Sequence, residues 1–129
     1  MDIGILCSGE GPELAFILAA AKSGRLPADI KIIITDRDSS ALALAREAGF
    51  YGCFVPRAIF HANRDGFERR LVELLREAGA EAVVLAGFLR EPGPVLEEAF
   101  PGKIFGRDIP PEALAAHLEK QLRSAGLSL

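Results

Sequence analysis

The sequence predicts a single α/β domain of three layers, with a mostly parallel sheet of about five strands covered by helices on both faces. Two observations lead to this prediction. Strand-like and helix-like patterns alternate along the 129 residues, as they do where helices join parallel strands. The strand-like segments are continuous apolar runs, which is typical of strands buried on both faces. A chain of this length fits one core, so we expect one domain over residues 1–129.

The first half of the chain holds three of the predicted strands, and each is bounded by helix or turn signals. These strands are expected at Ile3–Cys7, Ile30–Thr35 and Tyr51–Val55. A helix over Pro12–Ser23 has proline at its first position and a glycine after its end. A second helix over residues 39–49 is capped by Ser39 or Ser40 and ended by Gly49.

The second half continues the alternation after an expected loop over residues 57–63. Helices are expected over residues 64–79, 92–100 and 110–126, and strands over residues 80–88 and 103–105. The helix over residues 64–79 has an apolar face made of Phe67, Leu71, Leu74, Leu75 and Ala78. The last helix has an apolar stripe, Leu114, Leu118 and Leu122, that can cover the sheet. The whole arrangement is Rossmann-like.

Ligands of such sheets bind at the carboxyl ends of the strands, near the point where the strand order reverses. The segments that follow the first, second and fourth predicted strands are therefore the candidate sites. They read "SGEGPE" from Ser8, "DRDSS" from Asp36 and "GFLREP" from Gly87.

Composition excludes several classes of function. A net charge of −3 without a basic block gives no attraction to nucleic acid, and no apolar run is long enough to cross a membrane. The start of the chain lacks the pattern of a secretion signal, so we expect a cytoplasmic protein. Cys7 and Cys53 fall in predicted strands and are expected as small apolar core residues. Without a CxxC motif or a histidine cluster, no metal site is predicted.

Four segments together resemble one enzyme family. They are "SGEGPEL", "AREAGF", "RDGFERRL" and "AEAVVLAGFLREPGPVLEEAFPGKI", in this order from Ser8 to Ile104. The sequence is similar to glycinamide ribonucleotide formyltransferases, which use 10-formyltetrahydrofolate in purine biosynthesis. The resemblance runs collinearly from Met1 to Ile104. It implies an N-terminal formyltransferase domain with a ribonucleotide and a reduced folate as ligands, although no cofactor is predicted to be required by this chain itself.

The loop after the first strand departs from that family. Family members have Ser-Gly-x-Gly-Ser-Asn there, and this loop holds the substrate phosphate. Ser8, Gly9 and Gly11 match the pattern, while Pro12 replaces the serine and Glu13 replaces the asparagine. Pro12 removes one N–H donor, and Glu13 adds a negative charge. The alternative interpretation is that the proline and the glutamate simply make a good helix start.

The resemblance also implies a folate pocket. Arg64 and Arg90 match family arginines around the folate, and Leu89 with the following loop would line the pterin pocket. The alternatives are a solvated helix end for Arg64, beside the acidic residues of its own helix, and a surface ion pair with Glu91 for Arg90.

The catalytic residues of the family are missing. Family members follow the fifth strand with Asn-Ile-His, and both side chains stabilise the oxyanion that forms during transfer. Here Gly106 stands in the asparagine position and Asp108 in the histidine position, and a later catalytic aspartate has no counterpart. Glycine has no side-chain donor, and an ionised aspartate would destabilise an oxyanion. No catalytic residue is therefore predicted.

Other polar residues form no further constellation. His61 and His117 have no partner at catalytic or ligand spacing, and Ser8 has no obvious base. Asp36 is placed where dinucleotide folds bind a ribose, but the glycines of the first loop lack the G-x-G-x-x-G spacing.

Three hypotheses for function stay open. The chain is a formyltransferase-related domain that is inactive alone, or half of an enzyme completed by a partner chain, or a structural or regulatory module that oligomerises. An uncovered sheet edge beside the fifth strand would supply a docking surface, and we expect a homodimer.

Overall fold

The computed structural model describes residues 1–8, 12–26, 28–38, 40–60, 63–88, 91–107 and 109–127. Within these residues, five strands form one parallel sheet in the order β3-β2-β1-β4-β5. The strands are β1 (Asp2–Cys7), β2 (Asp29–Thr35), β3 (Gly52–Phe54), β4 (Ala82–Leu85) and β5 (Ile104–Phe105). The α-helices are α1 (Pro12–Lys22), α2 (Ser40–Glu47), α3 (Arg64–Glu77), α4 (Pro94–Ala99) and α5 (Pro111–Leu127). The predicted α/β class with a Rossmann-like sheet is therefore confirmed.

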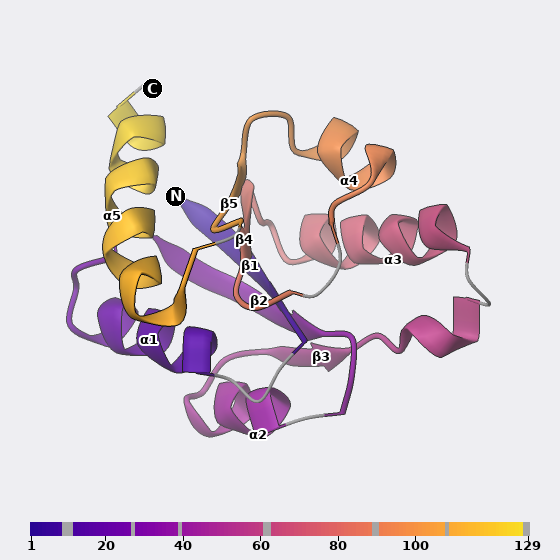
Figure 1. Cartoon of the computed structure of the whole chain (residues 1–129), viewed down its shortest axis with the longest axis horizontal. Helices are drawn as coiled ribbons and strands as arrows, with labels where there is room; N and C mark the ends of the chain where they lie inside the picture. Colours follow the sequence, from indigo (N-terminus) through magenta and orange to yellow (C-terminus); the bar gives the residue numbers. More distant parts are fainter. Residues whose placement is uncertain are drawn as a thin grey trace.

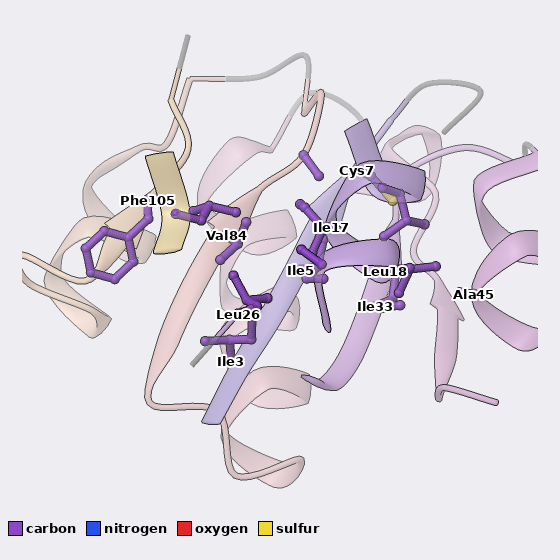
Figure 2. Close-up of a cluster of buried hydrophobic side chains, with 14 of the residues drawn as sticks. Ile3, Ile5, Cys7, Ile17, Leu18, Leu26, Ile33, Ala45, Val84 and Phe105 are labelled. Atoms are coloured by element: carbon purple, nitrogen blue, oxygen red, sulfur yellow. The ribbon is translucent and has the colours of Figure 1, made fainter. Parts of the chain in front are cut away.

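The helices lie in two layers, one on each face of the sheet (Figure 1). Helices α1, α2 and α5 pack on one face, around a core that includes Ile5, Ile17 and Leu118 (Figure 2). Helices α3 and α4 pack on the other, around Phe67 and Leu96. Strand β1 is buried on both faces, which explains why the sequence shows it as an unbroken apolar run.

The predicted elements are present with shifts of a few residues at their ends. The largest shortening is in β4, which keeps only Ala82–Leu85 of the nine residues predicted over 80–88, while β3 keeps Gly52–Phe54 of five. Part of the expected loop over residues 57–63 forms a 3₁₀-helix, η1 (Arg57–Phe60), so the loop prediction was wrong there. Short 3₁₀ turns are common connectors, and "RAIF" gives no periodic signal that would reveal one.

The predicted helix faces are confirmed where the structure describes them. Phe67, Leu71, Leu74 and Leu75 are buried on α3, and Ala78 is half-buried. On α5, Leu118 and Leu122 are buried, whereas the side chain of Leu114 lies outside the described residues. Among the helices of the described part, none combines the length and the apolar character that crossing a membrane requires.

Candidate active site at the carboxyl ends of the strands

The strand order reverses between β1 and β4. From β1 the chain passes through α1 to β2 and then outward to β3, whereas β4 and β5 lie on the opposite side of β1. All described pairings are parallel, so the carboxyl ends of the strands share one edge. The crevice outside the ends of β1 and β4, here called the switch crevice, is therefore the expected ligand site.

Two predicted site residues of the first loop lie at the switch crevice. Ser8 follows β1 directly and is fully buried. Glu13 lies in the first turn of α1 and is half-buried. Its carboxyl group lies over Gly87, just after β4, since a Cβ added at Gly87 would be 2.9 Å from both Cδ and Oε2 of Glu13. The glutamate thus places its charge across the crevice, against the backbone of the neighbouring strand.

Gly87 has a backbone that suits this close approach. Its φ of +71° lies in the left-handed region, and the carboxyl group of Glu13 leaves no space for a side chain. The sequence placed Gly87 in a candidate segment but did not reveal its contact with Glu13, because the two residues are far apart in the chain.

Negatively charged side chains near the end of β1 affect the pKa of the Cys7 thiol. Burial, together with the nearby carboxylates of Asp36 and Glu13, raises the pKa of this thiol to about 12. The thiol also donates to the carbonyl of Ile34 at 3.6 Å. Cys7 is therefore a protonated core residue at neutral pH, as predicted, and cannot serve as a thiolate nucleophile.

Asp36 does not present its carboxylate to solvent. Its side chain is 1% exposed, and Oδ2 lies 2.8 Å from Nε of Arg57 in η1, while Arg37 approaches Oδ1 at 3.7 Å. This ion pair ties the end of β2 to η1. A carboxylate held in this way is not free to bind ribose hydroxyls, which agrees with the missing glycine spacing.

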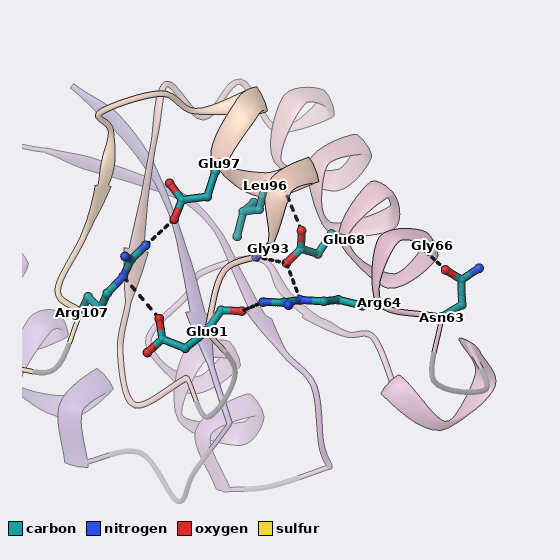
Figure 3. A network of polar contacts seen from close by, with 9 residues as sticks. All are labelled: Asn63, Arg64, Gly66, Glu68, Glu91, Gly93, Leu96, Glu97 and Arg107. Atoms are coloured by element: carbon teal, nitrogen blue, oxygen red, sulfur yellow. Dashed lines mark hydrogen bonds and ion pairs between the residues drawn. The ribbon is translucent and has the colours of Figure 1, made fainter.

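Arg64 begins α3 and contacts the segment that follows β4 (Figure 3). Its Nη2 donates to the carbonyl of Glu91 at 2.6 Å, and its Nε lies 3.8 Å from the carboxylate of Glu68. The Arg64 side chain is 45% exposed. Arg64 is therefore partly engaged within the protein, and its role toward a folate stays a prediction.

Glu68, which the sequence did not single out, holds this segment in place. Its carboxylate is buried and accepts from the backbone N–H groups of Gly93, at 2.5 Å, and Leu96, at 3.0 Å (Figure 3). It caps the start of α4, where unpaired N–H groups favour an anion. The only indication of this role in the sequence was that Glu68 lies among the apolar residues of the buried face of α3.

The segment after β5 carries no side-chain donor at its first position. Gly106 is buried, with a φ of +88°. The side chain of Arg107 contacts two glutamates (Figure 3). Its Nη2 lies 2.6 Å from the carboxylate of Glu97 in α4, and its Nε lies 3.9 Å from the carboxylate of Glu91, which precedes α4. The arginine that the sequence left unassigned thus joins the end of β5 to the segment after β4.

Several candidate residues lie outside the described part of the chain. These are Gly9, Gly11, His61, Leu89, Arg90 and Asp108. Pro12 begins α1, as predicted, but its side chain is not described. Among the described residues, no three histidine, cysteine, aspartate or glutamate side chains gather in a way that could hold a metal ion.

Comparisons with known proteins place the chain in a family. The family model described as formyl transferase matches residues 1–106. Phosphoribosylglycinamide formyltransferase of Escherichia coli K12 is 28% identical over 105 residues, which are 81% of this chain and 49% of that protein. The Haemophilus influenzae enzyme of the same name is 30% identical over 107 residues, 79% of this chain and 48% of its own. The chain spans about half the length of these curated relatives.

Solved structures agree with the sequence comparison. Glycinamide ribonucleotide transformylase 1 of Symbiobacterium toebii superimposes with a TM-score of 0.76 at 35% identity, over 81% of this chain and 49% of that one. Transformylase 1 of Geobacillus kaustophilus superimposes with a TM-score of 0.75 at 25% identity, over 97% of this chain and 68% of that one. Since the family model matches most of the chain, this protein belongs to the formyl transferase family.

Proposed function

We propose that this chain is a phosphoribosylglycinamide formyltransferase-related domain that keeps the binding scaffold of its relatives but does not transfer a formyl group by itself. Membership of the formyl transferase family and the names of the similar enzymes support the substrate class. The observation that carries the second half of the proposal is Gly106, which stands without a side-chain donor after β5. The carboxylate of Glu13 over Gly87 additionally predicts weak binding of the substrate phosphate.

A carboxylate in the switch crevice disfavours a phosphate monoester. Two unit charges about 4 Å apart repel by about 1 kcal/mol in water and about 4 kcal/mol near a protein surface. That range corresponds to about one to three decades of affinity. The N-terminus of α1 would otherwise attract an anion, so Glu13 opposes the contribution that the helix makes.

The segment after β5 supports the absence of independent catalysis. Gly106 offers no side chain to a developing oxyanion. Removing one oxyanion donor typically costs about 10² to 10³ in rate. A folate bound at the crevice would supply the formyl group, while this chain's described residues would only help to bind and orient it. We propose no further cofactor and no metal.

The proposal also covers the cellular compartment and the oligomeric state of the protein. Cys7 and Cys53 are free thiols, which suits the reducing cytoplasm predicted from the sequence.

Among the described residues, β5 pairs only with β4, so its other edge is available for a second chain. A homodimer through this edge, or a partner chain that supplies the missing donors, is the alternative to an isolated domain, and analytical ultracentrifugation distinguishes a dimer from a monomer.

Calorimetric titration with phosphoribosylglycinamide, repeated with a reduced folate present, tests the proposal. We expect the unmodified chain to bind the ribonucleotide with a Kd above about 100 μM, and Glu13→Asn to bind at least about tenfold more tightly. Lys22→Gln, which changes a charge at the far end of α1, serves as the control and should leave the Kd unchanged.

The same samples also test catalysis. Incubation with 10-formyltetrahydrofolate and the ribonucleotide should give no formylated product above the uncatalysed rate, for the unmodified chain and for Glu13→Asn. Turnover by the chain alone would contradict the proposal. Tight ribonucleotide binding by the unmodified chain would contradict the role of Glu13 while leaving the substrate class intact.

A further inference from the structure

A groove lies between the outer side of α5 and the edge strand β5, which stand next to each other in Figure 1. It has a volume of about 590 Å³, which falls within the range of ligand pockets. Its walls include Lys103, just before β5, and the turn that precedes it. The groove therefore extends toward the amino end of β5, whereas the switch crevice lies at the carboxyl ends of the strands.

One stripe of α5 faces this groove. His117, Lys120, Gln121 and Ser124 all line it, and their spacing of three, four and seven residues puts them on one side of the helix. Leu118 and Leu122 of α5 point elsewhere, because they are buried in the core. This stripe is the polar side of an amphipathic helix, so its side chains are accessible to a ligand from solution.

The groove is positively charged in a protein whose net charge is −3. Its lining residues include Lys103 and Lys120, half of the chain's four lysines, and no carboxylate. Among the residues that the structure describes, neither of these ammonium groups lies within 4.0 Å of a carboxylate. The nearby Glu119 contacts Arg25 and Arg123 instead. Both lysines are thus available to an anion from solution.

The groove also has an apolar wall and uncharged polar groups. Phe105 of β5 contributes the aromatic ring. Gln121 contributes an amide whose Oε1 is buried and accepts no hydrogen bond from the described residues.

We propose that this groove binds a small organic anion with a flat apolar body, such as an aromatic carboxylate or sulfonate. The anionic group lies between Lys103 and Lys120, and the apolar body packs against Phe105. The proposal is independent of the function proposed above, because it uses neither the switch crevice nor its residues.

The probe for the test is 8-anilino-1-naphthalenesulfonate, an aromatic sulfonate whose fluorescence rises in an apolar site. The four lysines allow a matched pair of variants. Lys103→Gln with Lys120→Gln removes both charges from the groove, while Lys22→Gln with Lys31→Gln removes two charges elsewhere. We expect saturable binding of one probe per chain, a Kd at least about tenfold higher in the first double variant, and a change below about twofold in the second.

Two further measurements locate the probe. N-phenyl-1-naphthylamine, which lacks the sulfonate, should bind at least about tenfold more weakly. Ser124→Trp, at an exposed position on the groove wall, should abolish binding while circular dichroism and urea unfolding stay as in the unmodified chain.

Equal effects of the two double variants, or equal binding of the neutral probe, would overturn the proposal. So would probe binding that disappears as the chain self-associates, because the groove would then be an interface between copies of the chain. Analytical ultracentrifugation at the protein concentrations of the titration measures the oligomeric state.

Discussion

Two glutamates lie over two glycines after β4, and their surroundings differ. Glu68 lies over Gly93, and Glu13 lies over Gly87; in both pairs a Cβ on the glycine would be 2.9 Å from the carboxylate. Glu68 is buried and accepts two backbone hydrogen bonds. Glu13 is half-buried and accepts no hydrogen bond from a residue that the structure describes.

The difference separates a structural carboxylate from one available to a ligand. Glu68 fixes the start of α4, and its charge is compensated by N–H groups and by Arg64. Glu13 lies at the crevice where ligands of this fold bind, and among the described residues no cation forms an ion pair with its carboxylate. We therefore expect Glu68 to determine stability and Glu13 to determine which ligands bind.

The largest expected effect concerns stability. Glu68→Ala leaves the N–H groups of Gly93 and Leu96 without an acceptor, so the free energy of unfolding should fall by about 2–4 kcal/mol. Glu13→Ala should change it by less than about 0.5 kcal/mol. Urea unfolding monitored by circular dichroism measures both. Equal losses in the two variants would remove the distinction between the glutamates.

The glycines provide the next test. Gly87→Ala should cost about 1–3 kcal/mol, because its positive φ is strained for alanine and the methyl group meets Glu13. Adding Glu13→Ala should recover the part due to contact but not the backbone strain. A double-mutant cycle from urea unfolding measures that coupling.

Gly93→Ala is the matched control for this cycle. Its φ of −94° is ordinary, so its whole cost comes from the contacts with Glu68 and Arg64. Removing Glu68 should not restore stability there, because the backbone N–H groups of Gly93 and Leu96 lose their acceptor.

A coupling energy of zero between Gly87→Ala and Glu13→Ala would show that the Glu13 side chain moves away from an added methyl group without cost.

The pH dependence of stability gives a smaller effect. The pKa of the Cys7 thiol is raised from 9.0 to about 12, so the folded state keeps its proton when the unfolded chain has lost it. The resulting stabilisation is complete below pH 9 and is lost as the pH rises toward 12. Between pH 8 and 10, the unmodified chain should lose about 1 kcal/mol more than Cys7→Ala. Identical slopes in the two proteins would refute this prediction.

The smallest expected effect is that of Arg64→Ala. The Arg64 side chain is 45% exposed, and its loss removes one hydrogen bond to the carbonyl of Glu91 and a long contact to Glu68. Solvent screening limits the cost to about 0.5–1 kcal/mol by thermal or urea unfolding. A loss as large as that of Glu68→Ala would make Arg64 part of the structural network, and not a residue available to a folate.

The sequence predicted the layers and the strands because their signals are local. Apolar runs such as Ile30–Thr35 and the glycines that end helices act within a few residues, and the structure confirms the elements they indicate. The prediction failed at Arg57–Phe60, where the local signal is weak, and it extended the fourth strand beyond Ala82–Leu85.

The contacts of the site could not be predicted in this way. Glu68 meets Gly93 across 25 positions of the chain, and Glu13 meets Gly87 only because β1 and β4 are neighbours in the sheet. A charge in the sequence does not show whether its partner is water, a backbone N–H or a ligand. The resemblance to formyltransferases pointed to Glu13 as unusual, but the strand order was needed to show where its carboxylate lies.

The central position of β1 affects how the chain folds during synthesis. β1 precedes both of its neighbours, and its contact with the β4 region joins Asp2 to Glu81, 79 positions apart. A ribosome adding about 5–20 residues per second needs roughly 4 to 16 seconds to make that interval. During this time one edge of an apolar strand has no partner from its own chain. We expect a chaperone that binds extended apolar segments to protect β1 until β4 emerges.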